Sequence, residues 1–296
     1  MSTVWRAFAK VNLDLRIVGK RADGYHEICT ILQAIDLNDE IRVSPSRSFR
    51  FTSSEGPRDE ANLVVRAVRA FEAETSIVVS LWLDLEKRIP PAAGLGGGSA
   101  DAAVTLMGLC RWYGVQLPGE RLHQLLADLG SDLPFFTLGG RALGIGRGER
   151  LFPLPDDSEY WLLLVNPGIS VQTREAYSWL TLFGESNNIF CFCSRFVPPQ
   201  GSVEPFGDFL LNDFETPLFR RFPELAEIKR KLSASGAYHA TLTGSGATIF
   251  GRFRNQREAD KAASDLDQEF DVKLTRPLRR SEYFSRMFEG SPDVAD

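Results

Sequence analysis

The sequence has few of the residues that build disulfide frameworks or metal centres, with four cysteines and three histidines among 296 residues. Cys191 and Cys193 form the only close cysteine pair, and no second Cys or His pair completes a zinc-binding set. We therefore expect all four cysteines to be reduced thiols in a cytoplasmic protein. No metal-ligating residue is predicted.

Long apolar runs and an excess of positive charge are also absent. The longest apolar run, Tyr160–Val165, is far shorter than the roughly 20 residues that cross a bilayer. The start of the chain lacks the pattern of a secretory signal. A formal net charge of -5 argues against a surface for nucleic acid or anionic lipid. We expect neither a membrane nor a nucleic acid as partner, and the sequence leaves the oligomeric state open.

Three common nucleotide-binding signatures are missing too. No lysine precedes Ser99 at the end of the glycine-rich stretch, so the P-loop pattern fails. The dinucleotide pattern G-x-G-x-x-G fails because position 99 is not glycine. The chain also contains no H-R-D or D-F-G segment, which excludes a protein-kinase fold.

The chain does contain a dense glycine cluster in the stretch Pro90–Ala103, which reads PPAAGLGGGSADAA. Glycines just before a helix let groups approach the main chain and aim backbone N–H groups outward at the positive end of the helix dipole, which suits phosphate. The alternative is a flexible loop without a ligand. Because a strand precedes the cluster and a helix of small residues follows it, we predict a phosphate-binding loop, with a positive φ at Gly97.

Hydrophobic periodicity divides most of the chain into strands and helices. Strands are predicted over Trp5–Val18, Ile28–Ile35, Leu37–Val43, Phe49–Thr52, Ile77–Leu85, Trp161–Asn166 and Val272–Pro277, with a strand, turn and strand over Tyr238–Phe253. Helices are predicted over Ala61–Ala73 with Asp59 as N-cap, Ser99–Tyr113, Glu120–Leu129, Ser170–Leu180, Pro223–Ser233 and Glu258–Phe270. Ser131–Phe136 is predicted to be a loop, and Ser186–Gly207 has no clear pattern.

The first strand carries two polar residues of interest. Its alternation places Lys10 and Asn12 on one face, opposite a row of apolar side chains. A solvated strand face is the commoner explanation of such residues, and the pattern alone leaves both explanations open.

The length suits two domains, and a stretch rich in glycine and proline follows Arg141. We expect an amino-terminal domain over 1–155 that contains the glycine cluster and a carboxy-terminal domain over 156–288. The tail, 289–296, is expected to be disordered.

Three segments resemble the GHMP kinases (galactokinase, homoserine, mevalonate and phosphomevalonate kinases) in their order and spacing. They are the strand A-K-V-N-L-D-L, the glycine cluster and the segment LTGSGATIFG over Leu242–Gly251. The resemblance covers Ala9–Gly251 and weakens over Ser186–Gly207. It implies an α+β, two-domain fold, with an amino-terminal ribosomal-protein-S5-like α/β domain and a carboxy-terminal ferredoxin-like α/β domain.

Further motifs are similar to one family within these kinases: R-A-D-G-Y-H-E-I, A-N-L-V-V-R-A, L-G-S-D-L-P-F-F and N-D-F-E. This resemblance implies that ATP, with Mg²⁺ whose ligands we do not assign, phosphorylates the 2-hydroxyl of 4-diphosphocytidyl-2-C-methyl-D-erythritol in the non-mevalonate isoprenoid pathway. The partners would be small molecules, ATP and a cytidine diphosphate sugar alcohol. A homoserine or mevalonate kinase is the first alternative, and the D-G-Y-H-E segment argues against it. A regulatory protein that binds nucleotide without catalysis is the second.

The resemblance also implies roles for individual residues. Lys10 and Asp132 would flank the hydroxyl that is phosphorylated, although an aspartate at position 132 could equally cap a helix or loop. The residues implied in substrate binding are Asn12, Tyr25, His26, Thr173 and Tyr177. Those implied in ATP binding are Asn62, Lys87, Pro91, Ala92, Ala93, Gly94, Leu95, Gly96, Gly97, Gly98, Ser99, Gly244, Ser245 and Gly246. Ala100 stands where many relatives have a second serine, so no hydroxyl acts there.

Overall fold

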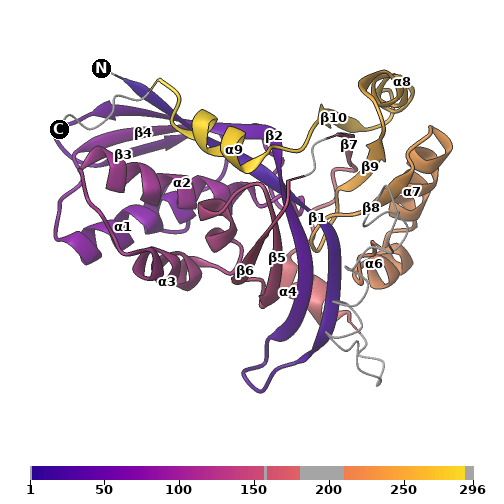
Figure 1. Cartoon of the computed structure of the whole chain (residues 1–296), viewed down its shortest axis with the longest axis horizontal. Helices are drawn as coiled ribbons and strands as arrows, with labels where there is room; N and C mark the ends of the chain where they lie inside the picture. Colours follow the sequence, from indigo (N-terminus) through magenta and orange to yellow (C-terminus); the bar gives the residue numbers. More distant parts are fainter. Residues whose placement is uncertain (1, 157–158, 181–209, 291–296) are drawn as a thin grey trace.

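The computed structural model describes residues 2–156, 159–180 and 210–290 and contains two β-sheets (Figure 1). The larger sheet consists of β1 (Thr3–Lys20), β2 (His26–Pro45), β3 (Arg50–Ser53), β4 (Leu81–Glu86), β5 (Arg141–Gly146) and β6 (Arg150–Leu154). The smaller sheet consists of β7 (Trp161–Asn166), β8 (His239–Leu242), β9 (Ile249–Phe253) and β10 (Asp271–Thr275), in the order β10-β7-β9-β8. The fold is therefore α+β, as expected. Each sheet together with the helices packed on it is called a layer below, the first layer containing the larger sheet and the second layer the smaller one.

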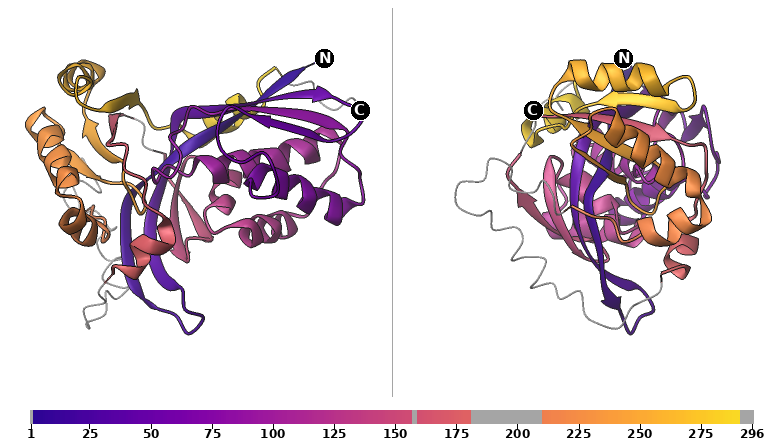
Figure 2. Two further views of the ribbon diagram at one scale, coloured as in Figure 1. Left: turned by 180° about the vertical axis from the view of Figure 1, so that it is seen from behind. Right: turned by 90° about the vertical axis from the view of Figure 1, so that its right-hand side faces the viewer.

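Strand β2 is central to the larger sheet because it is long enough to pair with two different strands along one edge. Its residues 40–45 pair with β4 and its residues 28–33 pair with β5, both antiparallel. Its other edge pairs with β1 over the length of both strands. The β1–β2 hairpin thus runs past the helices of the first layer toward the second sheet (Figure 2).

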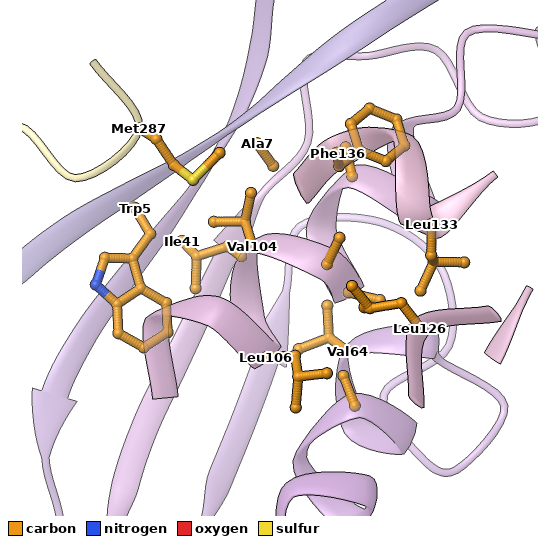
Figure 3. Packing of buried hydrophobic residues seen from close by; sticks show 14 of the residues in the cluster. Trp5, Ala7, Ile41, Val64, Val104, Leu106, Leu126, Leu133, Phe136 and Met287 are labelled. Atoms are coloured by element: carbon orange, nitrogen blue, oxygen red, sulfur yellow. The ribbon is translucent and has the colours of Figure 1, made fainter. Parts of the chain in front are cut away.

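Helices cover one face of the larger sheet (Figure 1). They are α1 (Leu63–Thr75), α2 (Gly97–Trp112), α3 (Gly119–Leu129) and the short 3-10 helix η1 (Leu133–Thr137). Small residues let α2 lie close to the sheet, since a Cβ on Gly108 would lie 2.5 Å from the Trp5 ring. Figure 3 shows the resulting core, in which Trp5 and Ile41 from the strands pack with Val104 and Leu106 from α2.

The second sheet is covered by α6 (Glu215–Arg221), α7 (Pro223–Ala234) and α8 (Gln256–Leu266), and α4 (Thr173–Ser178) lies beside the hairpin. The hairpin contributes Leu15, Ile17 and Ile28 to the core of this second layer. Burying apolar side chains in both layers ties the hairpin to each of them.

One helix of the expected carboxy-terminal domain packs with the amino-terminal core. Helix α9 (Arg280–Met287) was not predicted, and it packs its Tyr283 and Met287 into the first core although it follows the second sheet in sequence. The division near residue 155 follows the end of β6 and remains a proposal. Of the tail, Glu289 pairs with Arg6, and 291–296 lie outside the described residues.

Several predicted elements need correction. Ile28–Ile35 and Leu37–Val43 form one strand, and Ile77–Ser80 precede β4 as irregular chain. The N-cap of α1 is Asn62, whose side chain accepts a hydrogen bond from the Val64 N–H, not Asp59. Part of the predicted 131–136 loop forms η1, and the stretch after Arg141 forms the β5–β6 hairpin. The unassigned 186–207 lie outside the described residues. No helix in the described ranges is long and apolar enough to span a membrane.

Candidate active site

Lys10 and Asn12 lie between two irregularities in the β1–β2 register, one between Phe8 and Lys10 and one between Asn12 and Asp14. Such bulges re-aim side chains and are common beside active sites. Lys10 Nζ donates to Asn12 Oδ1 at 2.6 Å, so the two side chains share a face as predicted. Both residues are buried, which excludes the solvated-face explanation.

The Lys10 ammonium lies next to Asp132, with Nζ 3.5 Å from Oδ2. The lysine side chain is 4% exposed and the aspartate side chain 46%. The cation is therefore enclosed, while the carboxylate faces open space where a substrate can reach it. Asp132 makes no side-chain capping bond to η1, so capping does not account for this aspartate.

The first glycine segment, Pro91–Ser99, touches both layers. The Lys10 N–H donates to the Leu95 carbonyl at 3.0 Å, and the Thr248 N–H donates to the Ala93 carbonyl at 3.4 Å. A Cβ on Gly94 would lie 2.2 Å from the Thr243 carbonyl oxygen, and Gly94 has φ +78. Gly94 is therefore required by a close approach of the second layer as well as by its own backbone angle.

Gly96 and Gly97 both lie close to side chains of other elements. Gly96 is the N-cap of α2, with φ 72, and a Cβ there would lie 3.1 Å from Lys10 Cε. Gly97 is the first residue of α2 and is not among the residues with positive φ, so that expectation was wrong. A Cβ on Gly97 would meet Ile89 Cγ2 at 2.9 Å. Packing against protein atoms thus explains both glycines.

The start of α2 is open toward a ligand. No side chain caps this helix, and Gly98 is exposed, with only Leu63 Cδ1 within 4 Å of a Cβ placed on it, at 3.9 Å. Ser99 is half-buried one residue further, and Ala100 is fully buried. Uncapped N–H groups at a helix start carry partial positive charge and bind phosphate oxygens.

Lys87 lies beneath this helix start in a group of buried charges. Its Nζ pairs with Asp101 Oδ2 at 2.7 Å and, more closely, with Asp39. Burial alone would lower the pKa of Lys87, but the Asp101 and Asp39 carboxylates raise it above its usual value. Burial raises the pKa of Asp101. The predicted nucleotide contact is therefore engaged by two aspartates in this structure.

Asn62 is also engaged within the protein. Its Oδ1 accepts from the Val64 N–H at 2.9 Å, and its Nδ2 donates to the Pro57 carbonyl at 2.8 Å. The next residue, Leu63, is the one nearest to Gly98. Asn62 thus lies near the start of α2, but its side chain caps α1.

The second glycine segment, Gly244–Gly246, is the buried turn between β8 and β9. Its neighbour Thr243 links three elements, because Thr243 Oγ1 accepts from the Asn12 N–H at 3.0 Å and donates to the Gly94 carbonyl at 3.2 Å. Ser245 Oγ donates to Thr173 Oγ1, on the first residue of α4, at 3.2 Å. The two glycine segments and Asn12 therefore meet at one point.

Aromatic residues gather at the turn end of the β1–β2 hairpin. His26 and Tyr177 stack with their ring centroids 4.9 Å apart and an interplanar angle of 29°. Tyr25 is 55% exposed, and the Arg147 guanidinium lies 4.8 Å from the centre of its ring. Burial and the nearby Lys20 charge lower the pKa of His26, which favours a neutral imidazole. Exposed and stacked rings of this kind can hold a planar base.

One electrostatic effect connects this aromatic group to the acid. Burial raises the pKa of Tyr177, and the Asp132 charge raises it further. The tyrosine is therefore neutral and lies within electrostatic reach of Asp132. A molecule held by the rings at one end could place its other end beside Lys10 and Asp132.

The structure thus brings together Lys10, Asn12, Asp132 and the two glycine segments, with Tyr177 and Thr173 alongside. Sequence reasoning missed Thr30, whose Oγ1 accepts from Asn12 Nδ2 at 2.8 Å, and Thr243. It also missed Arg147 at the β5–β6 turn. Thr243 directly precedes the glycines of the second segment, and this position could have marked it as a site residue. Nothing in the sequence indicates that Arg147 lies next to Tyr25.

Comparison with known proteins identifies the family of this chain. The family model described as GHMP kinases N terminal domain matches residues 62–140, and the one described as GHMP kinases C terminal matches residues 199–272. A curated relative from Solibacter usitatus, called 4-diphosphocytidyl-2-C-methyl-D-erythritol kinase, is 40% identical over 93% of this chain and 89% of the relative.

Two solved structures are similar to this chain, one in both sequence and fold and one in fold alone. A crystal structure of 4-(cytidine 5'-diphospho)-2C-methyl-D-erythritol kinase superposes with a TM-score of 0.78 and 34% identity, covering 94% of this chain and 99% of the other. The mevalonate kinase of Methanococcus jannaschii superposes with a TM-score of 0.72 but 16% identity, over 94% and 99% of the two chains. The second likeness concerns the fold alone.

Proposed function

The chain belongs to the 4-diphosphocytidyl-2-C-methyl-D-erythritol kinase family of GHMP kinases, and from that premise we propose how its residues perform the reaction. The reaction is the ATP-dependent phosphorylation of the 2-hydroxyl of 4-diphosphocytidyl-2-C-methyl-D-erythritol, a step in isoprenoid precursor synthesis. The observation that carries the assignment of residues is the Lys10–Asp132 pair beside the uncapped start of α2.

Asp132 accepts the proton of the substrate hydroxyl, and Lys10 keeps this carboxylate oriented. The hydroxyl oxygen forms a bond to the γ-phosphorus of ATP while the bond from that phosphorus to the β–γ bridging oxygen breaks, which releases ADP. Because the transition state of phosphoryl transfer is loose, positioning and charge stabilisation contribute most. The enclosed Lys10 ammonium supplies a positive charge there, and Asn12 fixes it by the 2.6 Å hydrogen bond.

The ATP phosphates are proposed to bind at the start of α2, between the two glycine segments. The uncapped first turn and the open space at Gly98 fit phosphate oxygens. Ser99 adds a hydroxyl on the same turn. Lys87 and Asn62 both bond to protein groups. They would support the site by fixing the elements around the start of α2, rather than by the direct nucleotide contacts expected from the sequence.

Mg²⁺ is the divalent ion that we propose to accompany ATP. In the described ranges no three His, Cys, Asp or Glu side chains are grouped as a resident metal site would require. Mg²⁺ commonly takes its ligands from substrate phosphates and water with one or two carboxylates. A fit without a dedicated protein cage is therefore reasonable, and the bound ion would neutralise charge on the phosphates.

The cytidine end of the substrate is proposed to lie among Tyr25, His26 and Tyr177. A base could stack on the exposed Tyr25 ring, whose other neighbour is the Arg147 guanidinium. His26 would face the polar edge of the cytosine as a neutral imidazole. Stacking of a base on an aromatic ring contributes roughly 1–3 kcal/mol, so Tyr25→Ala should raise KM about tenfold with little change in kcat.

A substrate panel tests this proposal. ATP consumption should be rapid with 4-diphosphocytidyl-2-C-methyl-D-erythritol and slow with homoserine, with mevalonate and with methylerythritol phosphate that lacks the cytidine. Equal turnover of methylerythritol phosphate with and without the cytidine would contradict the aromatic subsite. We also propose a cytoplasmic setting, on the basis that Cys110 is a free thiol.

A further inference from the structure

One short segment contacts both halves of the site and has no role in the mechanism described so far. It is Asn212–Glu215, the N-D-F-E motif, and its residues together contact β1, α4, β8, α7 and the turn after β8. The inference drawn from it rests on the proposed function, because it assigns one residue to the ATP side and another to the cytidine side.

Asn212 holds the second glycine segment. Its Nδ2 donates to the Leu242 carbonyl at 2.9 Å and to the Gly244 carbonyl at 2.8 Å. Its Oδ1 accepts from the Phe214 N–H at 2.9 Å. Asn212 is 4% exposed, so losing these bonds would leave buried carbonyl groups without this donor. One amide therefore fixes the end of β8 and the turn that follows it.

Phe214 holds the aromatic group. Its ring meets that of Tyr177 edge to face, with centroids 4.9 Å apart and an interplanar angle of 89°. Phe214 is fully buried. Tyr177 is held in turn by its stacking on His26. An edge-to-face pair has a preferred geometry, so Phe214 sets the plane of the Tyr177 ring.

The remaining residues fix the segment in place. Asp213 Oδ2 accepts from the Ile17 N–H at 2.7 Å, which ties the segment to β1. Glu215 Oε1 accepts from Thr241 Oγ1 at 2.8 Å, and its Oε2 accepts from Lys229 Nζ at 2.7 Å. The segment is thus anchored to β1, β8 and α7 by carboxylates that touch neither Gly244 nor Tyr177.

We propose that Asn212 and Phe214 are positioning residues for two different substrates. Asn212 keeps the turn at Gly244 in the shape that meets the ATP phosphates. Phe214 keeps the Tyr177 ring in the plane that receives the cytosine. Neither residue touches a substrate, and the two act separately although they are two positions apart.

Binding measurements on the full chain test this separation without relying on turnover. The probes are a non-hydrolysable ATP analogue and cytidine diphosphate, titrated by calorimetry. Asn212→Asp keeps the size of the side chain and the acceptor for the Phe214 N–H but replaces the donor to both carbonyls. It should raise the Kd of the ATP analogue about tenfold, the order that one buried hydrogen bond contributes, and leave the Kd of cytidine diphosphate within about twofold.

Phe214→Leu should give the reverse result, because it removes the aromatic partner of Tyr177 and keeps an apolar side chain. The Kd of cytidine diphosphate should rise about fivefold, and that of the ATP analogue should stay within about twofold. Asp213→Asn is the matched control in the same segment, since its amide oxygen can still accept from the Ile17 N–H. Both dissociation constants should stay near those of the parent.

Two outcomes overturn the inference: equal weakening of both probes by each variant, which indicates a general structural role, or no change in either. If Asn212→Asp does not fold, Asn212→Ser replaces it in the test. Its shorter side chain cannot bond both carbonyls, so the Kd of the ATP analogue should again rise and that of cytidine diphosphate should stay within about twofold. Failure of the parent chain to bind cytidine diphosphate at all would contradict the proposed function, and with it the role of Phe214. The role of Asn212 would then be decided by the ATP analogue alone.

Discussion

The two glycine segments meet at one point but are built differently. The first, Pro91–Ser99, ends in the 16-residue helix α2 and has an exposed glycine at Gly98. The second, Gly244–Gly246, is a buried hairpin turn held by side chains from other elements. The first presents helix N–H groups to a ligand, whereas the second closes against the first through Gly94 and Gly244.

The difference shows that glycine density has more than one cause. At Gly94, Gly96 and Gly97 the space of a side chain is occupied by Thr243, Lys10 and Ile89, respectively. Only Gly98, among the glycines of the first segment, borders open space. Most of these glycines therefore let protein groups approach, and in particular they let Lys10 cross the start of α2 to reach Asp132.

The largest effect is expected at Asp132, which lies beside the first segment. Asp132→Asn keeps the shape of the side chain but removes its charge and its ability to accept a proton. It should lower kcat by roughly 10²–10⁴, the range of general acid–base groups. Binding of an ATP analogue should barely change, because the phosphates are proposed to bind the N–H groups at the start of α2 rather than this carboxylate. Near-parental kcat would remove Asp132 from the mechanism.

A smaller effect is expected where the two segments touch. Gly94→Ala would place a Cβ 2.2 Å from the Thr243 carbonyl oxygen at φ +78. Positive φ costs an alanine roughly 1–2 kcal/mol, and the clash adds to it. The segments must move apart, so the ATP analogue should bind at least about tenfold more weakly. Gly119→Ala, whose Cβ would meet nothing within 4 Å, is the control, with an expected change below about twofold; equal losses in the two variants would refute the steric account of Gly94.

Gly96 connects the first segment to catalysis. A Cβ there would lie 3.1 Å from Lys10 Cε and 3.1 Å from Phe136 Cζ. Displacement of the lysine should lower kcat of Gly96→Ala about tenfold, with a smaller change in ATP affinity. Steady-state kinetics beside calorimetry separates the two effects. A variant that loses ATP affinity and keeps kcat would show that Gly96 serves the phosphates instead.

The elements behind the two segments also differ in charge. Near the first glycine segment, Lys87 pairs with two aspartates. Strand β8, which leads into the second glycine segment, begins at His239. Burial lowers the pKa of His239 to about 4, with Arg252 and Lys229 contributing. His239 therefore stabilises the fold above pH 6.5, and this contribution is lost as the pH falls toward 4.

The resulting pH effect is the smallest one expected. Between pH 7 and pH 5.5 the unfolded chain gains protons at position 239 that the folded chain does not, which costs about 1 kcal/mol of unfolding free energy. His239→Gln cannot take up the proton, so its stability should fall less over that interval. Denaturant unfolding at both pH values measures the difference. Parallel pH dependence in parent and variant would contradict a neutral buried imidazole.

Much of this arrangement could be predicted from the sequence, because it depends on local pattern. Alternation placed Lys10 and Asn12 on one face, and the glycine cluster marked the start of α2. Contacts between distant segments could not be predicted in the same way. The approach of Thr243 to Gly94 and the return of α9 to the first core depend on how the layers pack, and no local pattern records them.

Capping and ion pairing explain the remaining differences. Asn62 and Asp59 are both good N-cap residues, and only the backbone angles of the folded chain select Asn62. Lys87 precedes the glycine cluster, a position from which a lysine can bind phosphate, but it is paired with Asp39 and Asp101. The ion pairs of Lys87 thus depend on residues that are distant from it in sequence.

The central claim is that Lys10 and Asp132 act as one unit at the junction of the two glycine segments. Steady-state kcat of Lys10→Ala, Asp132→Asn and the double variant tests it most directly, with ATP affinity measured alongside. Each single variant should lose roughly 10²–10⁴ in kcat, and the double variant should be little worse than the poorer single one. Losses that multiply in the double variant would mean that the two residues act independently, which contradicts the claim.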